Sequence, residues 1–186
     1  MKLISTGLSG VVIVEPQIYE DSRGWFAESF NADRFEDALA GIGLPPAGQF
    51  VQDNHSCSHE GVLRGLHYQK SPHAQGKLVR VVKGRAFDVV VDLRRSSSTF
   101  GQYFGMDLSE HNKLMLWIPE GFAHGFLALE DNTHFLYKTT GYYHQASEAC
   151  IFWNDPDLSI EWPMRKVFLS PKDEQANGFA QAEFFS

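Results

Sequence analysis

The chain has 186 residues, of which 43% are hydrophobic, and a formal net charge of −7. This length supports one substantial hydrophobic core and is short for two, so we predict a single domain over residues 1–186. A nucleic-acid surface needs a basic face and a membrane span needs a long apolar segment, so we expect neither nucleic acid nor membrane as a partner.

Only two cysteines are present, Cys57 and Cys150, and they are far apart in the sequence. They match neither a zinc-binding motif nor a disulfide framework, and reduced thiols are typical of cytoplasmic proteins. The N-terminal residues also lack the apolar stretch of a signal peptide. We therefore expect a cytoplasmic location.

In chain order, the predicted elements are mostly strands. Short β-rich runs bounded by Gly, Pro, Asn or Ser occur at residues 11–15, 78–82, 86–93, 114–118, 125–129 and 134–139. Asn31 can cap a helix that extends to about Ala40, and Ser170 can cap a second helix that begins at Pro171. Many short strands with closely spaced turns are typical of a sandwich or barrel. We therefore predict a mainly β fold with a few short helices.

The run at residues 86–93 shows the clearest alternation. Phe87, Val89 and Val91 share one face, whereas Asp88 and Asp92 lie on the other. Such a pattern predicts an antiparallel strand with one face buried and one face in solvent.

The segment GVLRGLHYQKSPHAQGK carries an imidazole, His67, between two cations, Arg64 and Lys77. A base beside fixed cations can remove a proton from carbon next to a carbonyl while it holds an anionic substrate. Strict alternation would put His67 and Arg64 on opposite faces, but Gly65 could hold a bulge that turns both inward. The competing interpretation of His67 is a structural histidine.

Asp173 and Tyr137 each allow two interpretations. Asp173 in the sequence SPKD fits the first turn of a capped helix, and it could also hydrogen-bond the far nitrogen of His67. Tyr137 in HFLYKT shares a face with Phe135 and Thr139, which suits a core residue. Its phenol could equally donate a proton opposite a histidine base.

The segment WIPEGFAHGF contains Pro119, Gly121 and His124 at a spacing that resembles the second cupin motif. Metal-binding cupins pair this motif with two histidines separated by one residue and a following glutamate. Here the first motif has only His67, and two imidazoles are too few for a catalytic metal, which usually has three protein ligands. We expect a cupin-like barrel without a metal, in which His124 is either a polar pocket residue or a packed one.

Two further segments could form turns and strand edges or a nucleotide pocket. DSRGWFAESF offers Arg23 and Glu28 with aromatic residues between them, and QDNHS offers amide groups. Aromatic stacking, amide hydrogen bonds and an arginine on phosphate are the contacts that a nucleotide needs. Neither a Walker nor a dinucleotide fingerprint is present, so we do not expect ATP or NAD.

Together with GVLRGLHYQ, AQGKLVRVVKG, LWIPEGFAHGF, FLYKTTGYY, WNDPDLSIEWP and LSPKD, these segments resemble the dTDP-4-dehydrorhamnose 3,5-epimerase family, in order and over about residues 10–173. The resemblance implies a cupin-type β-barrel (jelly roll) that forms a homodimer and uses neither a metal nor an organic cofactor. It implies the substrate dTDP-4-dehydro-6-deoxy-D-glucose, with epimerisation at C3 and C5 next to the C4 ketone.

The resemblance also implies roles for individual residues. His67 matches the general base, Asp173 its dyad partner, Tyr137 the acid on the opposite face of the sugar, and Lys77 the cation near the carbonyl oxygen. The other substrate-binding positions that it implies are Arg64 at the diphosphate, Gln52, Asp53, Asn54, His124, Glu148 and Lys172, with Arg23 and Glu28 supplied by the partner subunit.

Three alternatives stay open. Relatives that invert one carbon share most of these motifs, so a single-centre 3- or 5-epimerase is the nearest alternative. A metal-dependent cupin enzyme and a catalytically silent sugar-nucleotide binding module are the others.

Overall fold

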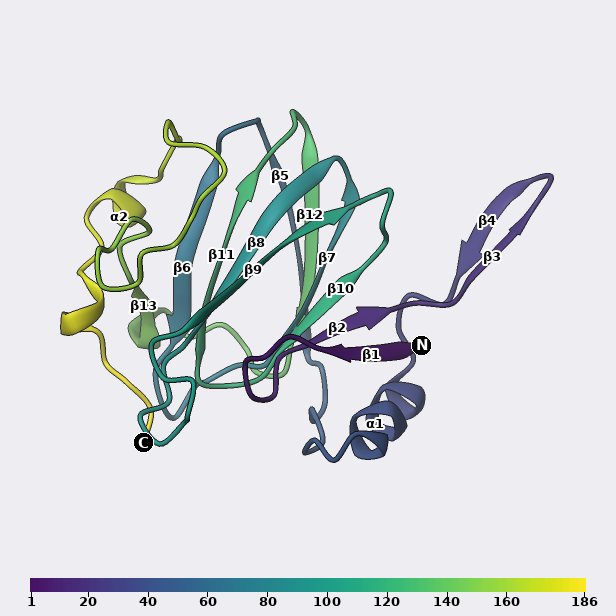
Figure 1. Cartoon of the computed structure of the whole chain (residues 1–186), viewed down its shortest axis with the longest axis horizontal. Coiled ribbons are helices and arrows are strands. Elements are labelled where there is room, and N and C mark those ends of the chain that lie inside the picture. The colour runs from purple at the N-terminus through teal and green to yellow at the C-terminus, as the bar shows by residue number, and fades with distance from the viewer.

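The structure, a computed structural model, describes residues 1–186 (Figure 1). Two short helices are present, α1 (Ala32–Gly41) and α2 (Pro171–Glu174). The strands are β1 (Lys2–Ser5), β2 (Val12–Glu15), β3 (Ile18–Asp21), β4 (Gly24–Ala27), β5 (Gln52–Ser58), β6 (Leu63–Gln69), β7 (Lys77–Lys83), β8 (Arg85–Asp92), β9 (Tyr103–Ser109), β10 (Met115–Ile118), β11 (Phe122–Ala128), β12 (Thr133–Thr139) and β13 (Glu148–Cys150).

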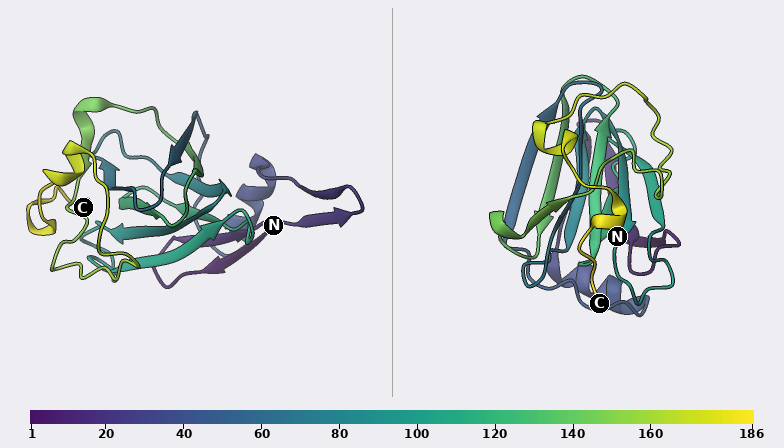
Figure 2. Two further views of the ribbon diagram at one scale, coloured as in Figure 1. Left: turned by 90° about the horizontal axis from the view of Figure 1, so that it is seen from above. Right: turned by 90° about the vertical axis from the view of Figure 1, so that its left-hand side faces the viewer.

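Most strands belong to two antiparallel sheets. One has six strands in the order β1-β2-β10-β7-β12-β5, and the other has five in the order β13-β6-β11-β8-β9. A core of twelve buried residues joins side chains of both sheets, including Val79 and Phe135 from the first and Val90 and Phe126 from the second. The two layers are visible in Figure 2. This arrangement confirms the predicted mainly β jelly roll with few helices.

Each of the six predicted strands is present, as β2, β7, β8, β10, β11 and β12. The predicted caps are also confirmed, because Asn31 accepts a hydrogen bond from the backbone of Arg34, and Ser170 accepts one from the backbone of Asp173. Helix α1 buries Phe35 and Leu39 against the outer face of the six-stranded sheet, where they pack with Trp117. Neither helix has the length and apolar character that a bilayer crossing requires.

Strand β8 corrects one prediction. It pairs antiparallel with both neighbours, as expected, but it is buried on both faces instead of one. Its Phe87 face lies under C-terminal residues such as Leu158 and Ile160, which cross the outside of the five-stranded sheet. The face of Asp88 points between the sheets, and both aspartates of the strand are fully buried. Alternation shows that the faces differ in polarity, and it does not show what covers each one.

The hairpin of β3 and β4 projects away from both sheets (Figure 1). It exposes three large aromatic side chains, because Tyr19, Trp25 and Phe26 retain 58%, 59% and 68% of their accessible surface. Arg23 lies at its turn, where its guanidinium pairs with Asp21. An extended apolar arm of this kind is typical of a segment that packs on another molecule.

Candidate active site

A cavity of about 610 Å³ lies between the two sheets at one end of the jelly roll. Strands β5, β7 and β12 supply one wall, β6, β11 and β13 supply the other, and α2 with the preceding residues closes one side. The predicted site residues that line it are Gln52, Asn54, Arg64, His67, Lys77, His124, Tyr137, Glu148, Lys172 and Asp173.

A bulge in β6 brings Arg64 and His67 to the same cavity. His67 pairs with His124 of β11, and Arg64 pairs with Phe126, so three residue steps on β6 face two steps on β11. The extra residue reverses the alternation, which turns both side chains inward and confirms the predicted effect of Gly65. Gly65 adopts φ 137°, and a Cβ there would lie 2.5 Å from the Cα of Gly125. Glycine is therefore required for the close approach of the two strands.

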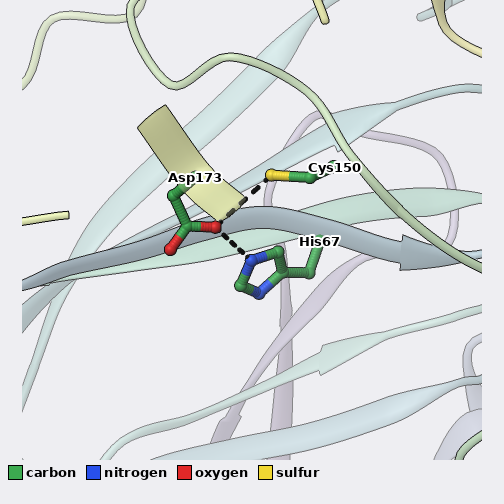
Figure 3. A group of neighbouring side chains, drawn as sticks. All are labelled: His67, Cys150 and Asp173. Carbon is green, nitrogen blue, oxygen red and sulfur yellow. Dashed lines mark hydrogen bonds and ion pairs between the residues drawn. The ribbon is translucent and has the colours of Figure 1, made fainter. Parts of the chain in front are cut away.

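His67 and Asp173 form a hydrogen-bonded pair. The Nε2 of His67 lies 2.5 Å from Oδ1 of Asp173, which comes from α2, 106 residues later in the chain (Figure 3). Asp173 is also held by Ser170, whose hydroxyl donates to its Oδ2 over 2.8 Å. Both interpretations of Asp173 therefore hold, because one carboxylate belongs to the capped turn and to the histidine pair.

The environment of Asp173 keeps it ionised. Burial alone would raise the pKa of this carboxyl, but hydrogen bonds from His67, Ser170 and Cys150 outweigh burial and lower the pKa. An ionised carboxylate can only accept hydrogen bonds, so Nε2 of His67 carries the proton in the pair. The lone pair of the neutral ring is then on Nδ1, which is the nitrogen able to act as a base.

Lys77 supplies a cation whose charge is easily lost. Its Nζ lies 3.5 Å from the backbone oxygen of His67. Burial lowers the pKa of Lys77 to about 8, while the negative charges of Asp88 and Glu148 oppose the shift. A lysine with this pKa is cationic at neutral pH and can also release a proton.

Tyr137 faces His67 from the opposite wall. It lies on β12 in the six-stranded sheet, whereas His67 lies on β6 in the five-stranded sheet, and both side chains line the cavity. Burial raises the pKa of the Tyr137 phenol, and the nearby positive charge of Arg64 opposes the shift. The phenol is therefore protonated at neutral pH and available as a donor.

His124 is both packed and polar. It is 7% exposed, lines the cavity from β11, and its Nε2 lies 2.7 Å from Oδ1 of Asp88. Asp88 is fully buried, and its other carboxylate oxygen has no hydrogen-bond partner. The two predicted alternatives for His124 are thus not exclusive.

Charged side chains surround the mouth of the cavity. Arg64 donates to the hydroxyl of Ser58 over 3.2 Å and has no carboxylate partner. Lys172 forms an ion pair with Glu148, which also accepts a hydrogen bond from Tyr143. Arg64 is thus the cation of this group that is free to bind an anion.

Three of the predicted binding residues lie outside the cavity. Asp53 is on the other face of β5, where Lys138 donates to it over 2.8 Å. Arg23 is on the projecting hairpin, and Glu28 follows it, paired with Arg34. The structure therefore leaves Arg23 and Glu28 apart from the cavity of their own chain.

Comparison with known proteins identifies the family. The profile of the dTDP-4-dehydrorhamnose 3,5-epimerase family matches residues 5–181. The chain belongs to this family. It is 51% identical to the dTDP-4-dehydrorhamnose 3,5-epimerase of Shigella flexneri over 185 residues, which are 100% of this chain and 99% of the relative.

This member of the epimerase family is also similar to a solved structure and to a relative with a different name. The dTDP-6-deoxy-D-glucose-3,5-epimerase of Legionella pneumophila, in complex with dTDP-4-keto-L-rhamnose, is 51% identical with a TM-score of 0.90, covering 98% of this chain and 94% of that chain. The dTDP-4-dehydrorhamnose 3-epimerase of Streptomyces niveus is 38% identical over 182 residues, or 98% of this chain and 86% of the relative.

Sequence reasoning missed several residues at the site of this epimerase family member. Tyr143 and Gln75 line the cavity from loops, and Cys150 lies beside the histidine pair. The aromatic pair that follows Gly141 was the available signal for Tyr143. Cys150 gave none, since a single cysteine without a neighbouring metal-binding or redox motif has no pattern.

The structure also holds one group of potential metal ligands. A nitrogen of His67, the sulfur of Cys150 and a carboxylate oxygen of Asp173 all lie within 4.8 Å of one another. Burial and the neighbouring Asp173 raise the pKa of the Cys150 thiol to about 12. This thiol is therefore protonated at neutral pH and contacts Oδ1 of Asp173 over 3.5 Å.

Proposed function

We propose that this chain epimerises dTDP-4-dehydro-6-deoxy-D-glucose at C3 and C5. The observation that carries the proposal is the arrangement of one cavity, in which the His67–Asp173 pair on one wall faces Tyr137 on the other. Epimerisation needs a base and an acid on opposite faces of a ring. The substrate class is that of the Legionella pneumophila relative, which was solved with dTDP-4-keto-L-rhamnose.

The first step is proton removal from carbon. The C4 ketone acidifies the hydrogens on C3 and C5, and Nδ1 of His67 accepts one of them. The carboxylate of Asp173 orients the ring and stabilises the imidazolium that forms. A positioned base of this kind contributes about 10²- to 10⁴-fold to the rate.

The second requirement is a group that stabilises the enolate. Lys77 lines the same cavity, and its ammonium can approach the oxygen on which negative charge develops. A donor at a developing oxyanion contributes about 10²- to 10³-fold. Neither contribution alone accounts for an enzymatic rate. The base therefore removes the proton from the carbon next to the ketone while Lys77 stabilises the charge on the ketone oxygen.

Inversion is completed by Tyr137. Its phenol donates a proton to the face of the ring opposite His67, so the hydrogen returns with the other stereochemistry. Two carbons served by one base require the sugar to turn in the cavity between steps. The cavity volume of about 610 Å³ is in the range that holds a small-molecule ligand.

Nucleotide binding involves both ends of the cavity and, in our proposal, a partner subunit. Arg64 binds the diphosphate, and the amide groups of Gln52 and Asn54 bind the base. Arg23 and Glu28 do not line the cavity of their own chain, and in this proposal they reach the cavity of a second copy through the hairpin. The proposed assembly is a homodimer, in the predicted cytoplasmic location.

The function is tested by product analysis. The purified chain is incubated with dTDP-4-dehydro-6-deoxy-D-glucose, and the sugar is assigned by proton NMR. We expect a product inverted at C3 and C5. Conversion at neither carbon, with dTDP still bound, would reject the proposal in favour of a silent binding module.

The same assay separates two alternatives. A product inverted only at C3 would identify a single-centre enzyme, an alternative that is favoured by the name of the Streptomyces niveus relative, a 3-epimerase. A metal-dependent enzyme would lose activity with a chelator and regain it with a divalent ion. We expect activity to survive chelation, because every step proposed above uses only side chains.

A further inference from the structure

Cys150 lies against the histidine pair, where its thiol donates to Asp173, and it transfers no proton in the mechanism above. Strand β13 pairs with β6 so that Cys150 is directly opposite His67, which puts both side chains on the same face of the sheet. Asp173 reaches the same point from α2, and its Oδ1 contacts both the imidazole and the thiol (Figure 3). A nitrogen and a sulfur therefore converge on one carboxylate oxygen, which brings three possible metal ligands together.

We propose that His67, Asp173 and Cys150 form an inhibitory binding site for a thiophilic divalent cation such as Zn²⁺. Imidazole nitrogen, carboxylate oxygen and thiolate sulfur are the ligands that Zn²⁺ takes in proteins. Zinc is often bound by three protein ligands, with its fourth position open to solvent. This donor set differs from the cupin metal site considered from the sequence, because it uses Cys150 and Asp173 in place of further histidines.

The three ligand atoms, all within 4.8 Å of one another, fit the cation after small movements of the side chains. Across a tetrahedral zinc, sulfur and oxygen ligands lie about 3.6 Å apart, and nitrogen and oxygen ligands lie about 3.4 Å apart. The Sγ of Cys150 already lies 3.5 Å from Oδ1 of Asp173. Nε2 of His67 lies 2.5 Å from Oδ1, so these two atoms must separate by about 0.9 Å.

The cluster can be reached from two sides. The main cavity opens on His67, whose side chain is 28% exposed, and on Asp173. A second cavity of about 360 Å³ is lined by Cys150 and the residues that follow α2. The ammonium of Lys172, whose charge acts on Cys150, is already paired with Glu148, so its repulsion of a cation is reduced.

Coordination would remove the catalytic base through the tautomer of the ring. In the free pair, the proton is on Nε2 of His67 and the lone pair is on Nδ1. A cation bound at Nε2 needs the lone pair of Nε2 itself, so the proton of the neutral imidazole moves from Nε2 to Nδ1, where it blocks proton uptake. The Cys150 thiol loses its proton to solvent as the sulfur–metal bond forms, so each cation bound releases one proton. The inhibitory effect rests on the proposed function, whereas metal binding does not.

Metal binding is tested with Cd²⁺ alone, whose bond to a thiolate gives an ultraviolet charge-transfer band. We titrate the reduced wild-type chain, Cys150→Ser and the matched control Cys57→Ser, since Cys57 is exposed and belongs to no ligand cluster. We expect the band at one equivalent in the wild type and in Cys57→Ser, and its loss in Cys150→Ser. A third variant, His134→Gln, tests the exposed pair His55 and His134 as a competing site, and we expect it to bind as the wild type does.

Inhibition is tested separately with Zn²⁺ in the epimerase assay. With each variant compared with its own rate in the absence of Zn²⁺, we expect Cys150→Ser, which keeps a hydroxyl donor beside Asp173, to need at least about tenfold more Zn²⁺ for half inhibition. Cys57→Ser should be inhibited as the wild type is. A Cd²⁺ band that persists in Cys150→Ser or disappears in Cys57→Ser would overturn the site, and so would equal Zn²⁺ sensitivity of the wild type and Cys150→Ser. The Cd²⁺ result needs no turnover, so failure of the proposed function would leave it unaffected.

Discussion

Asp173 determines which nitrogen of His67 can accept a proton. Its carboxylate binds Nε2 and is itself fixed by Ser170 at the start of α2. Because the pKa of Asp173 is lowered, the carboxylate stays charged throughout the neutral range. The proposed base thus depends on a contact between residues that are 106 positions apart.

At the same scale, Tyr137 is predicted to act after proton removal. In Tyr137→Phe, His67 and Lys77 still form the enolate, but no acid is available on the opposite face. We expect loss of inverted product by at least about 100-fold, while solvent deuterium still enters the sugar. Tyr103→Phe, which changes a tyrosine outside the cavity, is the control and should behave as wild type. Absence of deuterium entry in Tyr137→Phe would contradict this order of events.

The lowered pKa of Lys77 predicts how kcat/KM changes at alkaline pH. Its pKa of about 8 means that the ammonium is present below this pH and is lost above it. Since kcat/KM reports ionisations of the free enzyme, we expect it to fall as the pH rises through about 8. Lys77→Arg, whose side chain stays charged, should be slower but should lose this alkaline decline. An unchanged decline in Lys77→Arg would assign it to another group.

Residue roles were only partly predictable from the sequence. The short segment that contains both His67 and Lys77 predicted that they belong to one site. It also suggested a bulge at Gly65. The pairing of Asp173 with His67 had no local signal, because it depends on how α2 packs at the open end of β6. Cys150 was assigned no role for the same reason.

At the scale of elements, the bulge in β6 is what aligns the site. A Cβ on Gly65 would lie 2.5 Å from the Cα of Gly125 in β11, and the residue has φ 137°. We predict that Gly65→Ala lowers the free energy of unfolding by about 3 kcal/mol, from backbone strain and overpacking together. Gly7→Ala is the control, because Gly7 has φ 93° with open space around it, and should cost about 1 kcal/mol. Chemical denaturation measures both, and equal losses would mean that the close approach of β6 and β11 does not matter.

Strands β5, β13 and β9 were not predicted from the sequence, each for its own physical reason. Strand β5 reads QDNHSCS, because its inner face lines the cavity and its outer face is exposed, so neither face is apolar. Strand β13 has only three residues, which is too few for a period. Strand β9 contains Gly105, whose missing side chain accommodates the ring of Phe87. Periodicity detects strands that have an apolar face, and strands that form a polar site lack one.

At the scale of the whole molecule, the projecting hairpin explains why two predicted binding residues lie away from the cavity. Its exposed aromatic residues suit an interface, and it carries Arg23 outward. Nothing in the sequence indicates which chain's cavity a side chain enters, so the assignment of Arg23 and Glu28 to the partner subunit came from resemblance alone.

That residues 1–186 form a single domain also stays a prediction.

The proposed homodimer, in which Arg23 reaches the cavity of the partner, predicts complementation between inactive variants. Arg23→Glu should disable the partner's cavity, and His67→Ala should disable its own. In mixed dimers one cavity receives both changes and the other receives neither. We expect equal amounts, unfolded and refolded together, to recover about one quarter of wild-type activity, since about half of the dimers are mixed. Recovery of no activity, with dimers formed, would mean that Arg23 serves its own chain.

The central claim is that His67, held by Asp173, removes the proton from carbon. The most direct measurement is proton NMR of dTDP-4-dehydro-6-deoxy-D-glucose in deuterated water, following exchange at C3 and C5. We predict exchange at both carbons with the wild-type chain and with the control His55→Ala, whose ring lies outside the cavity, and none with His67→Ala even though dTDP still binds. Exchange by His67→Ala at a rate close to that of the wild type would contradict the account.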